Sequence, residues 1–251
     1  MLKISDLTKK FGAFQALNVG QIDIPRGQVT GIVGPNGAGK TTLFNTVGGA
    51  FRPDTGQVML DGTDITGLPP HKLAEQGLVR TFQISRDLGA LTILENLLLA
   101  RPGQLGESIT ASLFSRARIR AEEENAVEQA RTLLERVDLW RLADQSAANL
   151  SGGQKKLLEV LRAMMLSPKV ILLDEPAAGV APTMEGVLAD FILSLKAEGV
   201  TFAIVEHDME MIERLCDSVY VMTEGREMMH GSFHEVTSDP RVLEAYLGSM
   251  V

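Results

Sequence analysis

The first group of residues that could do chemistry is a glycine-rich stretch, Gly34-Pro35-Asn36-Gly37-Ala38-Gly39-Lys40-Thr41. It fits the phosphate-binding P-loop pattern G-x-x-x-x-G-K-[ST]. Glycines let successive backbone N–H groups turn toward one centre, and a helix that begins at Lys40 adds the positive end of its dipole. The Lys40 ammonium can then reach the outer phosphates, and the Thr41 hydroxyl can bind Mg²⁺. A glycine-rich turn can match by accident, but the strand and helix signals on either side argue against that.

Two adjacent carboxylates, Asp174 and Glu175, follow the apolar run 170–173. Consecutive residues at the end of a strand point in different directions, so the two can divide labour. We expect Asp174 to hold Mg²⁺ and Glu175 to polarise an attacking water molecule. Two acids after an apolar run are common in proteins, and it is the P-loop upstream that favours this interpretation.

A third motif, Leu150-Ser151-Gly152-Gly153-Gln154, precedes a helical stretch at 155–166. Ser151 is a plausible N-cap, and exposed glycine amides at a helix start form an anion site. Because the chain already offers one site for phosphate, a nucleotide held by both sites is the economical explanation. An ordinary capped helix after a glycine turn is the alternative.

These motifs must be positioned by strands, and three apolar runs at 29–33, 170–173 and 201–205 predict them. Each run is continuously apolar, as in parallel strands that are buried on both faces. Helices should therefore cover both sides of the sheet. The runs 218–222 and 227–229 predict a hairpin, and 57–62 predicts another strand that ends in a turn.

The middle of the chain, from Ile93 to Trp140, lacks strand signals and predicts a helical insertion. We expect the acidic run 122–124 to be a solvated first helical turn, with a recognition surface as the alternative. One apolar stripe at helical spacing comprises Ala126, Val127, Ala130, Leu133, Leu134 and Val137.

Bulk properties restrict the class of protein. The 251 residues are 45% hydrophobic, which is enough for a packed core, and the net charge of −8 argues against a nucleic-acid partner. Cys216 is the single cysteine, so we expect a small core residue in a reducing cytoplasm. Charges interrupt the N-terminus too early for a secretory signal, and Lys, Glu or Asp interrupts the longest candidates for a membrane helix, so neither is expected.

The combination of motifs resembles the ABC ATPases over essentially the whole chain. The resemblance is carried by the P-loop from Gly34, Gln83 after Arg80-Thr81-Phe82, the motif 150–154, Asp174-Glu175-Pro176 and His207, in the family's order and spacing. It implies an α/β fold: a P-loop NTPase core of the RecA-like type with an antiparallel β subdomain and an inserted helical subdomain. The whole chain, 1–251, would be one ABC ATPase domain, with the core in 1–84 and 160–251 and the helical subdomain in 85–159.

The resemblance also implies roles for single residues, with ATP and Mg²⁺ as ligands. Phe11, where many relatives have Tyr, would stack on adenine, and His207 would contact the γ-phosphate. The implied nucleotide-binding residues are Phe11, Gly34, Pro35, Asn36, Gly37, Ala38, Gly39, Lys40, Thr41, Thr42, Ser151, Gly152, Gly153 and Gln154; the metal-binding residues are Thr41, Gln83 and Asp174; and the catalytic residues are Glu175, His207 and Gln83.

In this family two ATPase domains face each other head to tail, so the resemblance implies a second copy or a related subunit as partner. It further implies transmembrane permease subunits, indirectly a solute-binding protein, and a peripheral position at the cytoplasmic face of the inner (cell) membrane. A short helix of the permease would dock near Gln83, Ile84, Leu88 and Leu91. Internal packing of the three apolar side chains is an equal alternative.

Four stretches, 80–83, 91–97, 205–209 and 246–248, resemble the ATPase subunits of branched-chain amino-acid importers. Subunits for uptake of urea or short amides and the ATPase for lipopolysaccharide export share much of this pattern. A soluble ABC ATPase serving iron–sulfur assembly, translation or DNA repair is the alternative from another class. One departure from the family is Ala181, which stands where many relatives have an Asp that acts across the dimer.

Overall fold

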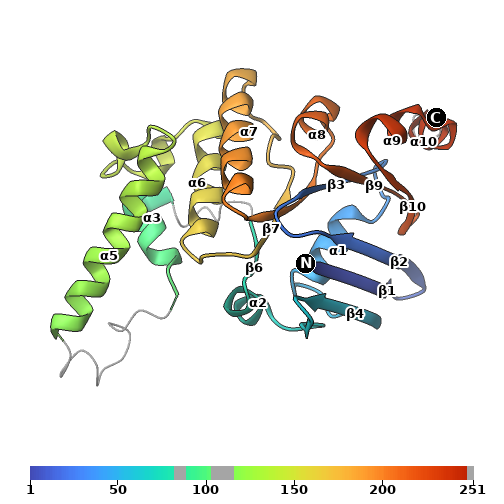
Figure 1. The fold of residues 1–251 in the computed structure, drawn as a ribbon, viewed down its shortest axis with the longest axis horizontal. Helices are drawn as coiled ribbons and strands as arrows, with labels where there is room; N and C mark the ends of the chain where they lie inside the picture. Colours follow the sequence, from blue (N-terminus) through green and yellow to red (C-terminus); the bar gives the residue numbers. More distant parts are fainter. Residues whose placement is uncertain (82–88, 103–115, 248–251) are drawn as a thin grey trace. The chain divides into compact units, whose positions relative to one another are not determined.

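The structure is a computed structural model, and it describes residues 1–81, 89–102 and 116–247. The chain divides into two compact units, which Figure 1 shows as a ribbon. Unit 1 comprises Met1–Thr81, Pro168–Ala178 and Ile192–Val251, and unit 2 comprises Phe82–Ser167 and Gly179–Phe191. Gln83, Ile84 and Leu88, which the sequence analysis singles out, lie outside the described residues.

A six-stranded sheet, in the order β10-β9-β3-β8-β7-β6, organises the described part of unit 1. The three apolar runs form parallel neighbours, as predicted, and β9 and β10 form the predicted antiparallel hairpin. The strands are β3 (Val29–Val33), β6 (Leu78–Arg80), β7 (Val170–Asp174), β8 (Thr201–Val205), β9 (Ser218–Thr223) and β10 (Arg226–Gly231).

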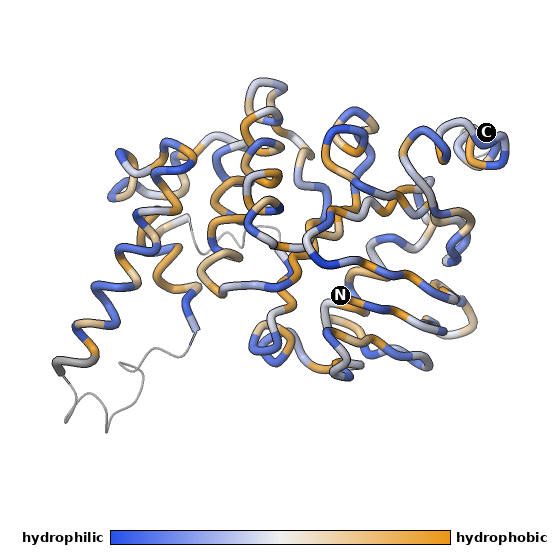
Figure 2. The backbone as a smooth tube through the Cα atoms, in the orientation of Figure 1, coloured by the Kyte–Doolittle hydropathy of each residue, from blue (hydrophilic) through white to orange (hydrophobic). Residues whose placement is uncertain are grey.

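Both faces of this sheet are buried, which explains why its central strands are mostly apolar and contain no charged residue before their carboxyl ends. Ile32 and Tyr220 belong to a core cluster shared with the second sheet and helix α1, whereas Val33 and Val221 pack with residues of helices α8, α9 and α10. The orange segments of the tube in Figure 2 follow these strands. The helices of unit 1 are α1 (Lys40–Val47), α2 (Pro70–Gln76), α8 (Met209–Leu215), α9 (Phe233–Ser238) and α10 (Pro240–Leu247).

A second, four-stranded antiparallel sheet has the order β2-β1-β4-β5. The sequence pattern predicts β4 but not β1 and β2. In β1 the side chains of Leu2, Ile4 and Leu7 are buried, whereas those of Lys3 and Asp6 are exposed. One face of the strand is therefore exposed to solvent, and the strand lacks a continuous apolar run. Its strands are β1 (Leu2–Phe11), β2 (Phe14–Ile24), β4 (Thr55–Leu60) and β5 (Thr63–Asp64).

The described part of unit 2 is helical, as predicted for the middle of the chain. Helix α3 packs against both α5 and α6. The elements are α3 (Ile93–Ala100), α5 (Arg116–Glu135), the 3₁₀ turns η3 (Trp140–Leu142) and η4 (Ala147–Asn149), α6 (Gly152–Met164) and the first part of α7 (Pro182–Ala197), which continues into unit 1.

Two expectations about the helical region are wrong in detail. Helix α5 begins at Arg116, so the acidic run 122–124 lies within the helix instead of in its first turn. The helix ends at Glu135, so Val137 lies beyond it, although Ala130 and Leu134 are fully buried as the stripe predicts. Asp138 adopts a positive φ of 56°, which shows that the chain has left the helical conformation there.

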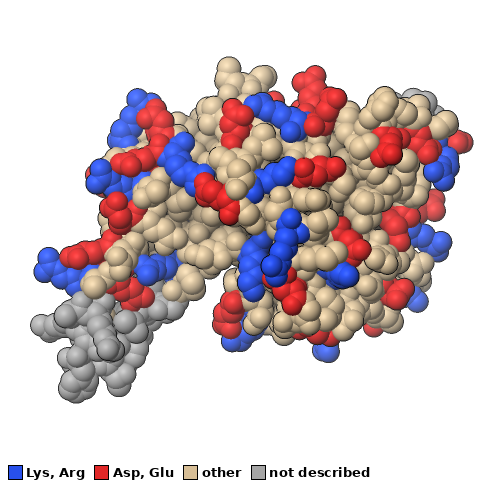
Figure 3. Space-filling view, viewed as in Figure 1, with Lys and Arg blue, Asp and Glu red and all other residues tan. Residues whose placement is uncertain are grey.

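Three further sequence features, the single cysteine, the surface charges and the lack of a long apolar stretch, can be followed in the structure. Cys216 packs against the cluster around Val33, and burial raises the pKa of its thiol to about 12, so the thiol stays protonated near neutral pH. On the face drawn in Figure 3, Lys and Arg side chains are interspersed with Asp and Glu. Within the described residues, no helix is long and apolar enough to span a membrane.

Candidate nucleotide-binding and hydrolysis site

The P-loop joins β3 to α1, and close backbone packing explains its glycines. Gly34 has a φ of 150°, and a Cβ atom there would lie 2.1 Å from the carbonyl oxygen of Met222. Gly37 has a φ of 81°, and a Cβ atom added there would have no neighbouring atom within 4 Å, so its conformation, and not its space, requires glycine. The loop therefore keeps a left-handed turn with open space beside Gly37.

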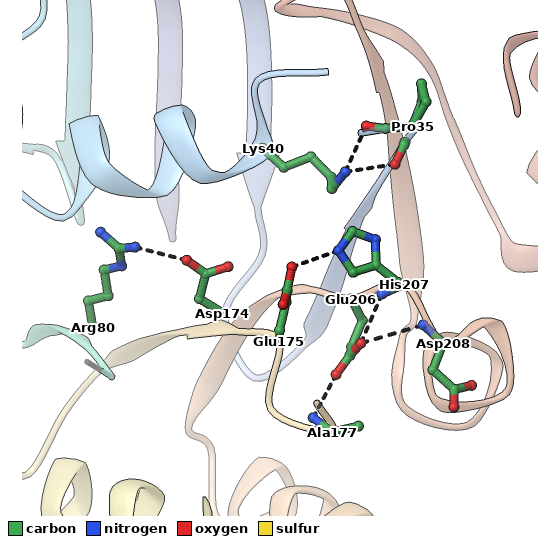
Figure 4. Close-up of polar contacts among 10 residues, drawn as sticks. Pro35, Lys40, Arg80, Asp174, Glu175, Ala177, Glu206, His207 and Asp208 are labelled. Atoms are coloured by element: carbon green, nitrogen blue, oxygen red, sulfur yellow. Dashed lines mark hydrogen bonds and ion pairs between the residues drawn. The ribbon is translucent and has the colours of Figure 1, made fainter. Parts of the chain in front are cut away.

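Lys40 is only 6% exposed and folds back over the loop. Its ammonium donates to the carbonyl oxygens of Gly34 at 2.7 Å and Pro35 at 2.9 Å (Figure 4). Burial lowers the pKa of Lys40, and the nearby carboxylates of Glu175 and Asp174 oppose that shift. The positive charge of Lys40 is thus held at the loop by backbone carbonyls and two acids.

The first turn of α1 offers hydrogen-bond donors to an anion. Its N-cap is Gly39, which has no side chain to accept a hydrogen bond from the helix amides. Thr41 is exposed and Thr42 is half-buried in that turn. The helix start therefore presents backbone N–H groups, the positive end of the dipole and the Thr41 hydroxyl to the same region.

Asp174, at the end of β7, forms an ion pair with Arg80 of the neighbouring strand β6 at 2.8 Å. Arg80 also donates to the side-chain oxygen of Asn45 on α1 at 2.6 Å. The Asp174 carboxylate and the Thr41 hydroxyl are hard oxygen donors, the type that Mg²⁺ prefers. The described residues contain no cluster of three or more His, Cys, Asp or Glu that could hold a metal.

Glu175 and His207 meet directly after the adjacent parallel strands β7 and β8. His207 Nε2 lies 2.6 Å from Glu175 Oε1, and both side chains remain partly exposed, at 48% and 40% (Figure 4). Glu175 has a φ of 49°, a conformation uncommon for a residue with a side chain. Its N–H still donates to the carbonyl oxygen of Val205 at 2.9 Å, which continues the ladder between the strands.

Phe11 lies at the end of β1, with 46% of its surface exposed. Its ring meets that of Phe51 edge to face, with centroids 5.3 Å apart, and the Lys9 ammonium lies 5.8 Å from its centroid. Phe51 and Lys9 thus cover part of the ring, and nearly half of Phe11 stays exposed. Residues Ser151 to Gln154 belong to unit 2, whereas Phe11, the P-loop, Asp174, Glu175 and His207 belong to unit 1.

The motif 150–154 forms the capped helix start that its sequence predicts. The Ser151 hydroxyl accepts from the Gln154 N–H at 3.3 Å, and the Gln154 side chain accepts from the Ser151 N–H at 3.0 Å. Gly152 is exposed, whereas a Cβ atom on Gly153 would lie 2.6 Å from Met184 of α7. Ala181 is exposed, and its carbonyl oxygen accepts from the N–H groups of Met184 and Glu185 at the start of α7.

Sequence reasoning missed three residues of the site. Arg80 pairs with Asp174, the backbone N–H of Gly34 donates to the hydroxyl of Tyr246, and Glu206 lies buried beside His207. For Glu206 a signal was present, because a charged residue directly after a wholly apolar strand needs buried partners. The contacts of Arg80 and Tyr246 depend on partners far away in the sequence.

Comparisons with known proteins agree with this geometry. The ABC transporter family profile matches residues 17–178. The probable branched-chain amino acid transport ATP-binding protein LivG of Archaeoglobus fulgidus is 44% identical and covers 99% of this chain and 96% of its own. The high-affinity branched-chain amino acid transport ATP-binding protein BraF of Pseudomonas aeruginosa is 40% identical, with coverages of 99% and 98%.

Solved structures give the same family. An ATP-binding cassette of an ABC transporter in its ADP conformation matches with a TM-score of 0.86 and 42% identity, covering 99% of this chain and 98% of that one. A dimeric bacterial ABC transporter cassette matches with a TM-score of 0.74 and 25% identity, covering 93% and 99%. With a P-loop fold and full-length relatives of this kind, the chain belongs to the ABC transporter family, as one of its ATP-binding and ATP-hydrolysing cassettes.

Proposed function

We propose that this cassette drives the uptake of branched-chain amino acids. The support is the transport function of its relatives LivG and BraF, which match at 44% and 40% identity over nearly their whole length. The cassette itself chooses no solute in this proposal, because the membrane subunits and a solute-binding protein would do so. The proposed location is peripheral, at the cytoplasmic face of the cell membrane.

The proposal that the cassette hydrolyses ATP at this site rests on the Glu175–His207 pair. The pair lies in the same unit as Lys40 and the P-loop. The P-loop amides and Lys40 would bind the phosphates of ATP, and Phe11 would stack on adenine. Asp174, Thr41 and Gln83 would hold Mg²⁺, which would supply positive charge to neutralise the phosphates when bound. Gln83 lies outside the described residues, so its part rests on the family resemblance.

The chemistry follows from the position of Glu175. Its carboxylate would orient a water molecule whose oxygen attacks the γ-phosphorus while the bond to the β-phosphate oxygen breaks, giving ADP and phosphate. His207, hydrogen-bonded to Glu175, would contact the γ-phosphate, and Lys40 would offset the negative charge of the transition state. In this scheme the residues mainly position groups and stabilise charge, as is general for phosphoryl transfer.

The proposed assembly contains two cassettes head to tail, so that Ser151, Gly152, Gly153 and Gln154 of one complete the nucleotide site of the other. The dimeric cassette structure of a relative supports this arrangement. In this proposal the whole chain acts as one ABC ATPase domain, and by resemblance to the family the permease subunits would dock near Gln83 and Leu91.

Two substitutions test the site. Glu175→Gln should bind MgATP normally and hydrolyse it at least about a hundredfold more slowly, the scale of one lost transition-state group. Lys40→Ala should instead lose ATP binding in equilibrium dialysis, because the main cation at the phosphates is gone. Near-normal turnover of Glu175→Gln, or unchanged affinity of Lys40→Ala, would contradict the assigned roles.

Uptake measurements test the solute. The cassette should be copurified with its membrane subunits, reconstituted in liposomes with the solute-binding protein, and supplied with radiolabelled leucine, valine or urea. The proposal expects ATP-dependent uptake of leucine and valine but not of urea. Uptake of urea alone would assign the chain to another solute, and a complex without membrane subunits would favour a soluble ATPase.

A further inference from the structure

The carboxylate of Glu206 joins the two loops that carry Glu175 and His207. Glu206 directly follows β8 and is only 3% exposed. Its Oε1 accepts from the N–H of Ala177 at 2.6 Å, and its Oε2 accepts from the N–H of His207 at 2.8 Å and of Asp208 at 3.4 Å (Figure 4). One side chain therefore contacts both loops through their backbones.

A buried carboxylate is costly unless its lone pairs are satisfied, so this arrangement needs a reason. The chain leaves the parallel ladder after β7 and β8, and the N–H groups beyond the ladder need acceptors other than strand neighbours. Glu206 provides both oxygens for that purpose. Charge-assisted hydrogen bonds of this kind are shorter and stronger than neutral ones, so the connection is stiff.

The connection bears on Glu175 through the turn that follows it. Glu175 is held at a φ of 49°, which a residue with a side chain adopts only when its surroundings enforce it. Ala177, whose N–H bonds to Glu206, lies two residues further in the same turn. Fixing Ala177 thus fixes the direction in which the Glu175 carboxylate leaves the strand.

On the other loop, the bond from Glu206 holds the backbone of His207 itself. The His207 ring then reaches Glu175 Oε1 at 2.6 Å. Release of either loop would allow this distance to change, and small misplacements of reacting groups are expensive in rate. We propose that Glu206 is a positioning residue for ATP hydrolysis, which sets the relative placement of Glu175 and His207. This inference rests on the proposed roles of those two residues.

The test begins with Glu206→Gln. The Gln side-chain oxygen can still accept a hydrogen bond from one loop. The Gln NH₂ group then faces the N–H donors of the other loop, so that loop loses its hydrogen bond. We expect kcat to fall at least about tenfold, because the reacting groups are misplaced. The KM for ATP should stay within about threefold, because the P-loop contacts are untouched. Glu206→Asp keeps the charge but is too short to reach both loops. It should likewise lower kcat and leave the KM for ATP nearly unchanged.

Glu227→Gln is a matched control. The Glu227 carboxylate also accepts backbone hydrogen bonds, from Gly20 at 2.8 Å and Gln21 at 3.0 Å, and so joins β10 to β2. The substitution makes the same chemical change and should leave kcat within about twofold, because β2 and β10 carry no proposed catalytic group. Equal kcat losses in both variants would reduce Glu206 to a general stabilising residue.

A double-variant measurement separates positioning from stability. Single-turnover hydrolysis should be measured for wild type, Glu206→Gln, Glu175→Gln and the double variant. If Glu206 acts through Glu175, its substitution should cost less than about threefold in the Glu175→Gln background, because groups that act as a unit are not additive. The same full loss in both backgrounds would overturn the positioning role. Normal hydrolysis by Glu175→Gln alone would overturn the proposed role of Glu175, and this inference with it.

Discussion

At the scale of a single residue, Phe11 offers the clearest quantitative test of nucleotide recognition. Stacking of an aromatic ring on a base contributes about 1–3 kcal/mol, so Phe11→Ala should weaken ADP binding by at least about fivefold. Phe11→Tyr should bind nearly as the wild type does, because the ring remains. Isothermal titration calorimetry with ADP measures both affinities.

The chain supplies its own control for Phe11. Phe14 is the cross-strand partner of Phe11 in the same hairpin and is 67% exposed. Phe14→Ala removes the same amount of aromatic surface from the same region but has no proposed contact with the base. If both alanine variants lose affinity equally, the effect comes from the hairpin and not from stacking by Phe11.

Residues of the site are predictable from the sequence when their partners are close to them along the chain. Residues whose partners are distant in the sequence are not. The pattern around Gly34 and Lys40 predicts its own backbone shape, because the loop and the helix start are local. Arg80 and Glu206 find their partners through the order of parallel strands, which brings β6 and β8 to either side of β7. That order is set by packing of the whole sheet, and no local spacing in the sequence records it.

At the scale of elements, helix α10 is connected to the beginning of the P-loop. Tyr246 packs with Val33 and Val242 in one cluster, and its hydroxyl accepts from the N–H of Gly34. Burial raises the pKa of Tyr246, and the bond from Gly34 opposes that shift, so the hydroxyl is neutral at physiological pH. A helix near the C-terminus thus fixes the first residue of the phosphate-binding loop.

Tyr246→Phe should reveal this connection. Removal of the hydroxyl leaves the N–H of Gly34 without this acceptor, and a hydrogen bond of this type contributes about 0.5–1.5 kcal/mol to the free energy of unfolding. We expect a loss of that size in urea unfolding and a fall of about threefold in ADP affinity, because the loop is less well fixed.

Tyr220→Phe is the matched control, since the Tyr220 hydroxyl accepts from the N–H of Asp23 at 3.0 Å, away from the P-loop. It should lose similar stability and keep the affinity for ADP. Identical affinities in Tyr246→Phe and Tyr220→Phe would show that α10 stabilises the fold without acting on the loop.

Strands that form an apolar run without charged residues are predictable from the sequence. Elements in which charged residues are mixed with apolar ones are not. Strands β3 and β8 have the predicted bounds because burial on both faces makes them mostly apolar and free of charge. Strand β1 escapes prediction because its charged residues face solvent. Helix α5 starts earlier than the sequence pattern predicts, because the charged residues around Arg120 carry no apolar stripe and resemble a loop.

At the scale of the whole molecule, one set of motifs requires a second cassette, and Gly152 is the position that tests this requirement. In the proposed dimer, Gly152 faces the γ-phosphate of ATP bound by the partner. Gly153 is unsuitable as a probe, because a Cβ atom there would collide with Met184. At Gly152 the nearest atom to such a Cβ, the carbonyl oxygen of Gly179, lies 3.1 Å away, so a small side chain needs only a slight adjustment.

Gly152→Asp should therefore fold and yet fail to dimerise. An acidic residue in the first turn of α6 is favourable to the helix itself, since it faces the positive end of the dipole. In the dimer the same carboxylate would oppose the phosphate charge of ATP, and like charges brought together in a site that excludes water repel strongly.

In a Glu175→Gln background, which retains ATP, we expect sedimentation velocity to show ATP-dependent dimers for the parent and for Gly152→Ala, and monomers for Gly152→Asp. The three proteins should bind ATP equally well as monomers, because the defect acts on the partner's nucleotide. Equal dimer fractions for Gly152→Ala and Gly152→Asp would show that the start of α6 does not meet the partner's ATP.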